Sequence, residues 1–162
     1  MNIRQAQPHE AGLVADVLGA AAAKIRAKGE IIWDPPEVSE AAVQKDVRAG
    51  AYYIASDPEG PVGVFRFELE DNYFWPEIPA GSSGFVHKIA VYPHKQGRAI
   101  AHALLAYACE LARGQGCGYL RLDCVSGKPK LRAVYESFGF RHHSEKKIGN
   151  MVFDRFEFAL GG

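Results

Sequence analysis

The sequence lacks several features that would assign it to a specialised class of protein. Its 162 residues carry 19 basic and 19 acidic side chains, so the formal net charge is zero and no bulk field attracts nucleic acid or an anionic membrane. The three cysteines fall on or beside apolar segments, which indicates reduced thiols and no disulfide framework. No apolar run is long enough for a signal sequence or a membrane span. We therefore expect a single cytoplasmic domain over residues 1–162, with neither nucleic acid nor membrane as a partner.

Helical and strand patterns alternate along the chain, and no internal repeat interrupts them. Apolar residues from Leu13 to Ile25 recur at helical spacing, whereas Phe65 and Phe67 alternate with polar neighbours as in a half-buried strand. In chain order, the expected elements are a strand at 3–6, helices after Pro8 and Ser39, strands at 52–55, 62–69 and 85–92, a long helix ended by Gly114 and Gly116, a strand at 119–125, a helix after Pro129, and strands at 140–147 and 151–160.

The stretch 86–105 joins an apolar strand to a small-residue helix through a turn that suits phosphate. Pro93 ends the strand because it has no N–H to donate to a ladder. The first turn of the following helix reads Gln96-Gly97-Arg98-Ala99-Ile100-Ala101. Backbone N–H groups at a helix start have no partner within the helix, and they bind anions readily. The sequence therefore predicts an anion site here.

This turn resembles the acyl-CoA signature of the GNAT (GCN5-related) N-acetyltransferases, which reads Gln/Arg-x-x-Gly-x-Gly/Ala. Ala99 stands where the family has Gly. Its methyl group leaves less space for a pyrophosphate to approach the backbone. A second block, residues 128–140, resembles a later helix of the family that ends in Tyr-Glu-x-x-Gly-Phe. The resemblance implies an α/β (α+β) GNAT fold, a mixed and mostly antiparallel seven-stranded sheet flanked by helices in the order β-α-α-β-β-β-α-β-α-β-β.

The same resemblance implies that the protein transfers an acetyl group from acetyl-CoA to the primary amine of a small molecule, by direct attack on the thioester. The family often has Asn where this sequence has Lys128, so Lys128 is expected at a CoA phosphate or in solvent. A non-catalytic acyl-CoA-binding sensor or partner module is the alternative, and Ala99 and Lys128 are the features that favour it. The implied cofactor-binding residues are Ile89, Ala90, Val91, Gln96, Gly97, Arg98, Ala99, Ile100, Ala101, Lys128 and Leu131.

Two residues are the main candidates for proton transfer. The resemblance implies that Tyr135 points at the cofactor sulfur, where a phenol can protonate the departing thiolate; its place on an apolar helix stripe equally fits core packing. Imidazole titrates near neutral pH, so His87 is a candidate base, although its apolar neighbours also fit a core histidine. The alternatives for the base are a water chain or the carboxylates of Glu68, Glu70 and Asp123.

The acceptor site is expected at two aromatic segments that border the amine groove in this family. They supply Trp33, Tyr73 and Trp75, and Asp123 is assigned to the same site. Aromatic walls suit an amine with an apolar or cationic body. A hydrophobic lid or a homodimer contact explains the same residues equally well. No metal site is expected, because the adjacent residues His142 and His143 point to opposite faces of a strand.

Overall fold

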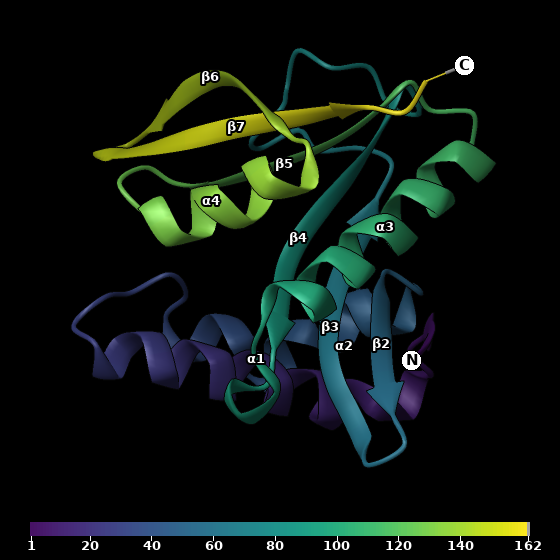
Figure 1. Cartoon of the computed structure of the whole chain (residues 1–162), viewed down its shortest axis with the longest axis vertical. Helices are drawn as coiled ribbons and strands as arrows, with labels where there is room; N and C mark the ends of the chain where they lie inside the picture. Colours follow the sequence, from purple (N-terminus) through teal and green to yellow (C-terminus); the bar gives the residue numbers. More distant parts are fainter. Residues whose placement is uncertain (162) are drawn as a thin grey trace. The chain divides into compact units, whose positions relative to one another are not determined.

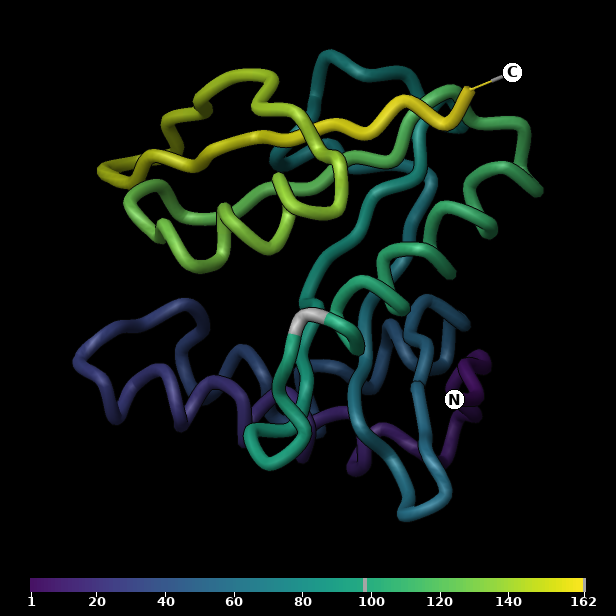
Figure 2. Tube along the Cα trace, viewed as in Figure 1, coloured from purple at the N-terminus to yellow at the C-terminus, as the bar shows by residue number. Residues whose placement is uncertain are grey.

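The order of elements agrees with the expectation from the sequence. The structure, a computed structural model, describes residues 1–161 apart from the side chain of Arg98. Figure 1 labels the helices and most strands, and Figure 2 follows the chain from a purple N-terminus to a yellow C-terminus. The elements are β1 (Asn2–Gln5), α1 (Ala11–Ala27), α2 (Glu40–Arg48), β2 (Tyr52–Asp57), β3 (Gly60–Glu68), β4 (Ser83–Val91), α3 (Arg98–Gly114), β5 (Tyr119–Val125), α4 (Pro129–Phe138), β6 (Arg141–Ile148) and β7 (Met151–Ala159).

Seven strands form one mixed sheet in the order β1-β2-β3-β4-β5-β7-β6, so the predicted fold class is confirmed. The pairs β1–β2, β2–β3, β5–β7 and β6–β7 are antiparallel. The pair β4–β5 is parallel, and its register covers Ser83–Phe85 against Tyr119–Arg121. β5 pairs with β7 along its whole length, whereas β4 runs on to Val91 beyond its ladder with β5.

Two compact units make up the chain, each from two stretches of sequence. The first unit contains Met1–Arg66 and Lys88–Leu104. Its core is apolar, and the Ser39 side chain starts α2 as expected by accepting a hydrogen bond from the Ala42 N–H at 3.2 Å. The buried residues of this core include Val14, Val17, Leu18, Val43, Val47, Tyr52, Ile54 and Val64.

The second unit contains Phe67–His87 and Leu105–Gly162. Its interior is aromatic and also holds charged groups. Trp75 is completely buried, with the guanidinium carbons of Arg121 and Arg155 at 5.0 Å and 4.5 Å from its ring centroid. Arg121 donates a hydrogen bond to Glu157 at 2.7 Å, and Arg155 forms an ion pair with Glu77 at 2.8 Å, so these buried cations are compensated.

The three cysteines are buried and free, which agrees with the expectation of reduced thiols. Burial raises the pKa of Cys109 to about 11 and that of Cys124 to about 12. Both thiols therefore stay protonated at neutral pH. Among the described residues, no helix combines the length and apolarity that a bilayer span requires.

Substitution of Gly63 on β3 tests how closely this strand approaches β4. A Cβ atom on Gly63 would lie 2.8 Å from the carbonyl oxygen of Ala90 and 3.3 Å from a Leu104 methyl carbon. A backbone oxygen cannot rotate away, so we expect Gly63→Ala to lower the free energy of unfolding by about 1–3 kcal/mol. Denaturant unfolding measures this change.

Gly19 on α1 provides the matched control, because a Cβ atom there would meet nothing within 4 Å. Alanine is favoured over glycine inside a helix by about 0.5–1 kcal/mol, so Gly19→Ala should be neutral or stabilising. If the Gly63→Ala variant is as stable as the wild type, β3 and β4 do not approach so closely that a Cβ atom would lie 2.8 Å from the Ala90 oxygen.

Candidate functional site

The predicted anion turn lies at the start of α3, a helix of 17 residues. Gln96 has extended backbone dihedrals, and Gly97 is exposed, with no atom within 4 Å of the position a Cβ would take. Ala99 is also exposed, whereas Ile100 and Ala101 are half-buried. The predicted contact of the Arg98 side chain falls outside the described residues. The first N–H groups of α3 have no acceptor within the helix, and the backbone before them, at Gly97, is open.

Lys24 on α1 brings a positive charge to this turn, which sequence patterns alone did not indicate. Its ammonium donates a hydrogen bond to Gln96 Oε1 at 2.6 Å. Lys95, immediately before the turn, is neutralised by Asp57 at 2.9 Å and Glu59 at 2.7 Å. These bonds raise the pKa of Lys95. Within the described part of the chain, no carboxylate pairs with Lys24 and competes with an anion, so it is the better placed cation for a phosphate.

The strand β4 carries a backbone irregularity at Lys88, whose φ of 51° lies in the left-handed region. Non-glycine residues adopt this conformation at an energetic cost, and such strain is often found at functional sites. The Lys88 ammonium forms an ion pair with Glu37 at 2.5 Å and lies 5.4 Å from the centre of the Trp33 ring. Beyond it, Ile89 is half-buried, and the next two predicted cofactor residues, Ala90 and Val91, are buried.

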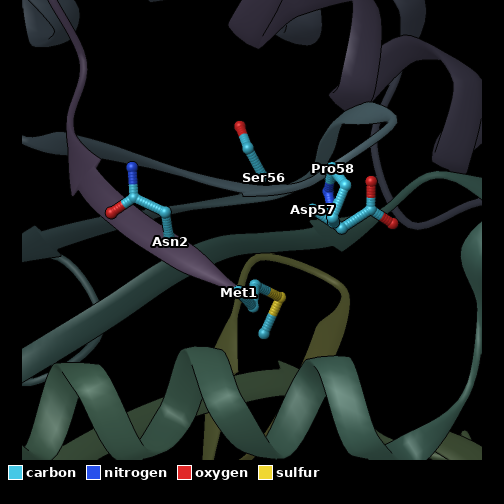
Figure 3. Close-up of a pocket in the computed structure, with 5 residues that line it drawn as sticks. All are labelled: Met1, Asn2, Ser56, Asp57 and Pro58. Carbon is cyan, nitrogen blue, oxygen red and sulfur yellow. The ribbon is translucent and has the colours of Figure 1, made fainter.

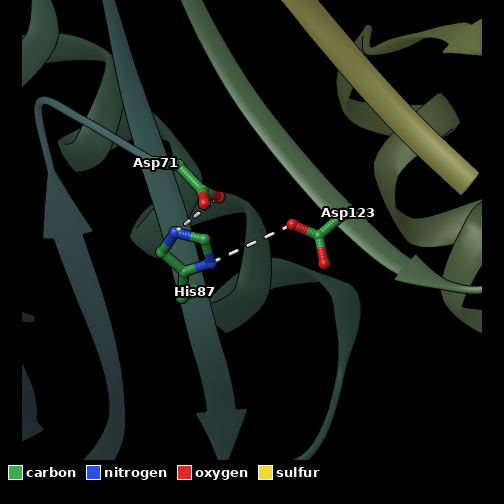
Figure 4. A group of neighbouring side chains, drawn as sticks. All are labelled: Asp71, His87 and Asp123. Carbon is green, nitrogen blue, oxygen red and sulfur yellow. Dashed lines mark ion pairs between the residues drawn. The ribbon is translucent and has the colours of Figure 1, made fainter. Parts of the chain in front are cut away.

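His87, the last residue of the second unit's part of β4, lies between two carboxylates (Figure 4). Its Nε2 is 3.3 Å from Asp71 Oδ2, and its Nδ1 is 4.0 Å from Asp123 Oδ2. The exposed fractions of the three side chains are 9% for His87, 5% for Asp71 and 9% for Asp123. The structure therefore brings together two predicted site residues, His87 and Asp123.

Asp71 is the member of this cluster that the sequence analysis missed. Its Oδ1 accepts hydrogen bonds from the backbone N–H groups of Tyr73 at 3.0 Å and Phe74 at 2.9 Å. Aspartate often accepts hydrogen bonds from backbone N–H groups that follow it in a loop. An aspartate at the start of this loop was therefore the signal in the sequence that could have identified Asp71 as a fixed carboxylate. Of the other two predicted alternatives for the base, Glu70 is exposed and accepts a hydrogen bond from Asn72, and Glu68 is half-buried.

Tyr135 on α4 is buried, with its ring 5.8 Å from that of Phe156 and 6.1 Å from that of Phe140. Burial is the main cause that raises the pKa of the phenol well above its usual value, and the electrostatic influence of Cys124 and Asp123 adds to it. The hydroxyl therefore keeps its proton at neutral pH and lies within the field of the Asp123 carboxylate. Lys128 and Leu131, at the start of the same helix, are half-buried.

The residues predicted for the acceptor site differ sharply in exposure. Tyr73 is 63% exposed, and Trp33 is half-buried against the core of the first unit. The prediction for Trp75 is wrong, because its ring has no exposed surface. The loop turns this ring inward, where the buried guanidinium groups of Arg121 and Arg155 lie against it, so it cannot contact an acceptor.

An open pocket in the first unit lies apart from these residues. Figure 3 shows the side chains that line it, which belong to the N-terminus with the start of β1, and to the end of β2 with the turn after it. None of these five is among the predicted site residues. They are Met1, Asn2, Ser56, Asp57 and Pro58.

The two histidines on β6 have different surroundings, as expected for adjacent strand residues. His142 Nε2 lies 2.9 Å from Asp154 Oδ1, whereas the exposed His143 lies against the edge of Trp75, with ring centroids 5.2 Å apart. The His142–Asp154 pair therefore provides a second histidine–aspartate contact in the second unit for comparison with His87.

Several solved structures with a similar fold are acetyltransferases or are described as such. A GNAT-family acetyltransferase from Listeria monocytogenes superposes with a TM-score of 0.79 at 17% identity, covering 98% of this chain and 94% of that one. A protein of Salmonella typhimurium, described as an acetyltransferase and solved with its cofactor acetyl-CoA, superposes with a TM-score of 0.75 at 16% identity, covering 100% and 95%. At these identities the likeness establishes the fold.

Sequence comparison points to the same family. A mycothiol acetyltransferase from Beutenbergia cavernae is 30% identical over 66 residues, which cover 41% of this chain but only 22% of that protein. The model of the Acetyltransferase (GNAT) family matches residues 20–140, a span that includes the anion turn, the His87 cluster and Tyr135. This chain therefore belongs to the GNAT acetyltransferase family.

Proposed function

We propose that this protein is an acetyl-CoA-dependent N-acetyltransferase that acetylates the primary amine of a small molecule. The observation that carries the proposal is the exposed start of α3, where open backbone at Gly97 precedes the first turn of a 17-residue helix, whose N–H groups have no partner within the helix. Family membership and the acetyl-CoA bound to the Salmonella typhimurium protein support it.

The turn from Gln96 to Ala101 would bind the pyrophosphate of CoA. Its N–H groups and the positive end of the helix dipole favour an anion, and the Lys24 ammonium adds a full charge. Arg98, Ala99 and Ile100 belong to the same turn. Backbone groups of Ile89, Ala90 and Val91 would bind the amide groups of the CoA arm, since the β4–β5 ladder covers an earlier part of β4. Lys128 and Leu131 would contact the cofactor from α4.

Acetyl-CoA supplies the activated acetyl group as a thioester. His87 would take a proton from the acceptor, because only a neutral amine has the lone pair that attacks the thioester carbon. Tyr135 would donate a hydrogen bond and then a proton to the sulfur as the carbon–sulfur bond breaks. Because burial raises the pKa of this phenol, the hydroxyl is protonated at neutral pH and has the hydrogen that this step requires.

The acceptor would contact Trp33, Tyr73 and Asp123. The Trp33 ring lies 5.4 Å from the Lys88 ammonium, and this cation–π contact supports a role for the ring beside a cationic amine. The exposed ring of Tyr73 is available for contact, and the Asp123 carboxylate has the charge that attracts an amine.

A non-catalytic acyl-CoA-binding module is the second candidate, favoured by Ala99 and Lys128 at positions where the family typically has Gly and Asn. Thiol release from acetyl-CoA across a panel of small amines distinguishes the two functions. We expect release that depends on the amine and saturates with it. Acetyl-CoA binding without release by any amine in the panel would support the module instead.

Gly97→Leu tests the cofactor turn. Because the Cβ position meets no protein atom, the leucine side chain should leave the fold intact but occupy the space in front of the turn. We expect acetyl-CoA to bind at least about tenfold more weakly, a change of roughly 1.4 kcal/mol, by calorimetry. Gly114→Leu, at the other end of α3 and equally unobstructed, is the control and should keep wild-type affinity. Unchanged affinity of the Gly97 variant would remove the cofactor assignment.

Tyr135→Phe tests the proton donor. The change removes one hydroxyl and keeps the ring that packs against Phe140 and Phe156, so we expect kcat to fall by roughly two orders of magnitude with CoA affinity retained. Tyr119→Phe on β5 makes the same chemical change at a half-buried tyrosine and should leave kcat at the wild-type level. Equal losses of CoA affinity and rate would instead assign Tyr135 to packing.

Trp33→Ala tests the acceptor site. We expect a higher KM for the acceptor and an unchanged KM for acetyl-CoA, because the ring would contribute binding to ground and transition states alike. Tyr53→Ala removes a half-buried aromatic ring from β2 and controls for stability: it should lower the melting temperature and leave the acceptor KM unchanged. If Trp33→Ala behaves in the same way, its ring is only a lid over the core.

A further inference from the structure

We propose that Asp71 is the positioning residue that orients His87 for proton transfer: its carboxylate, in ion-pair contact with Nε2, keeps the ring hydrogen on that nitrogen and leaves Nδ1 as the proton acceptor. This inference rests on the proposed function and refines its catalytic step. Asp71 lies in the loop between β3 and β4, and its carboxylate faces the imidazole in Figure 4.

Asp71 is held rigidly by its own loop. Oδ1 accepts the backbone N–H groups of Tyr73 and Phe74, which fixes the plane of the carboxylate. Oδ2 then lies 3.3 Å from His87 Nε2. No hydrogen bond reaches this buried oxygen in the described part of the chain, so the ion-pair contact with the ring nitrogen is the interaction that compensates its charge.

An ionised carboxylate only accepts hydrogen bonds, and a neutral imidazole carries one N–H. The contact with Asp71 therefore favours the form of His87 that carries its hydrogen on Nε2, and the lone pair is left on Nδ1. Nδ1 faces Asp123 Oδ2 at 4.0 Å. That carboxylate stabilises the positive charge which the ring gains when Nδ1 takes a proton.

Burial distinguishes this arrangement from an ordinary surface pair. The Asp71 and His87 side chains are 5% and 9% exposed, whereas the comparable pair on β6 and β7 leaves His142 30% exposed. Two carboxylates beside one buried imidazole are costly to desolvate, and an apolar residue at position 87 would pack without that cost. A proton-transfer role explains why ionisable groups occupy this place.

Asp71→Asn is the decisive variant. Asparagine keeps the oxygen that accepts the two backbone N–H groups, and it places an NH₂ donor against Nε2. The hydrogen of His87 should then move to Nδ1. We expect long-range ¹H–¹⁵N spectra of ¹⁵N-histidine-labelled protein to show this switch, with His87→Gln assigning the signals. We also expect kcat to fall at least about a hundredfold while the KM for acetyl-CoA is unchanged.

Asp154→Asn makes the same change at the His142 pair and serves as the control. It should alter only the His142 signals and leave kcat at the wild-type level. Wild-type kcat in the Asp71→Asn variant, or a His87 signal that does not change, would overturn the proposal. Activity that is lost on chelation and restored by a divalent cation would assign the three groups as metal ligands and also overturn it.

The spectra separate this proposal from the proposed function, because they require no turnover. If no amine supports thiol release by the wild-type protein, the acetyltransferase function fails. Even then, spectra in which the His87 hydrogen lies on Nε2 in the wild type and on Nδ1 in the Asp71→Asn variant would support the contact between Asp71 and His87. The same His87 signals in both proteins would overturn it.

Discussion

The strand β4 is the constraint on which the rest of the structure depends, because both compact units are built on it. Its first five residues, to His87, belong to the second unit, and its last four, from Lys88, belong to the first. The parallel ladder to β5 covers Ser83–Phe85, and the backbone then passes through the left-handed conformation of Lys88. The left-handed residue Lys88 is thus also the first residue of β4 that belongs to the first unit. It directly precedes residues 89–91, the part of β4 that is predicted to bind the cofactor.

Charge compensation governs the interior of the second unit. The buried guanidinium groups of Arg121 and Arg155 each have a carboxylate partner, and both lie against the Trp75 ring. Removing one partner from such a network would leave an isolated buried charge, which is far more costly than an exposed one. The same unit holds the His87 cluster, so ionisable groups there serve two purposes: some stabilise the core, and we assign others to proton transfer.

The two units carry different parts of the proposed chemistry. The first presents an exposed helix start and the Lys24 ammonium, which suit a phosphate group. The second holds His87, its two carboxylates and the Tyr135 phenol, all largely buried. Anion binding needs accessible donors, whereas tuning a proton transfer needs groups shielded from water, and the exposure of the residues follows that division.

The sequence by itself determined the elements and their order, since apolar periodicity, Pro93 and the glycines that end helices are local signals, and the resemblance to the GNAT family added the fold class. It also located the turn from Gln96 to Ala101, because a helix start exposes its N–H groups whatever it packs against. Only the tertiary structure decided which side chains meet. Asp71 lies 16 positions before His87 and 52 before Asp123, so no spacing rule connects them, and Trp75 looked available until the burial of its loop was known. Such contacts depend on how strands far apart in the sequence pair and pack, and short-range patterns do not encode that.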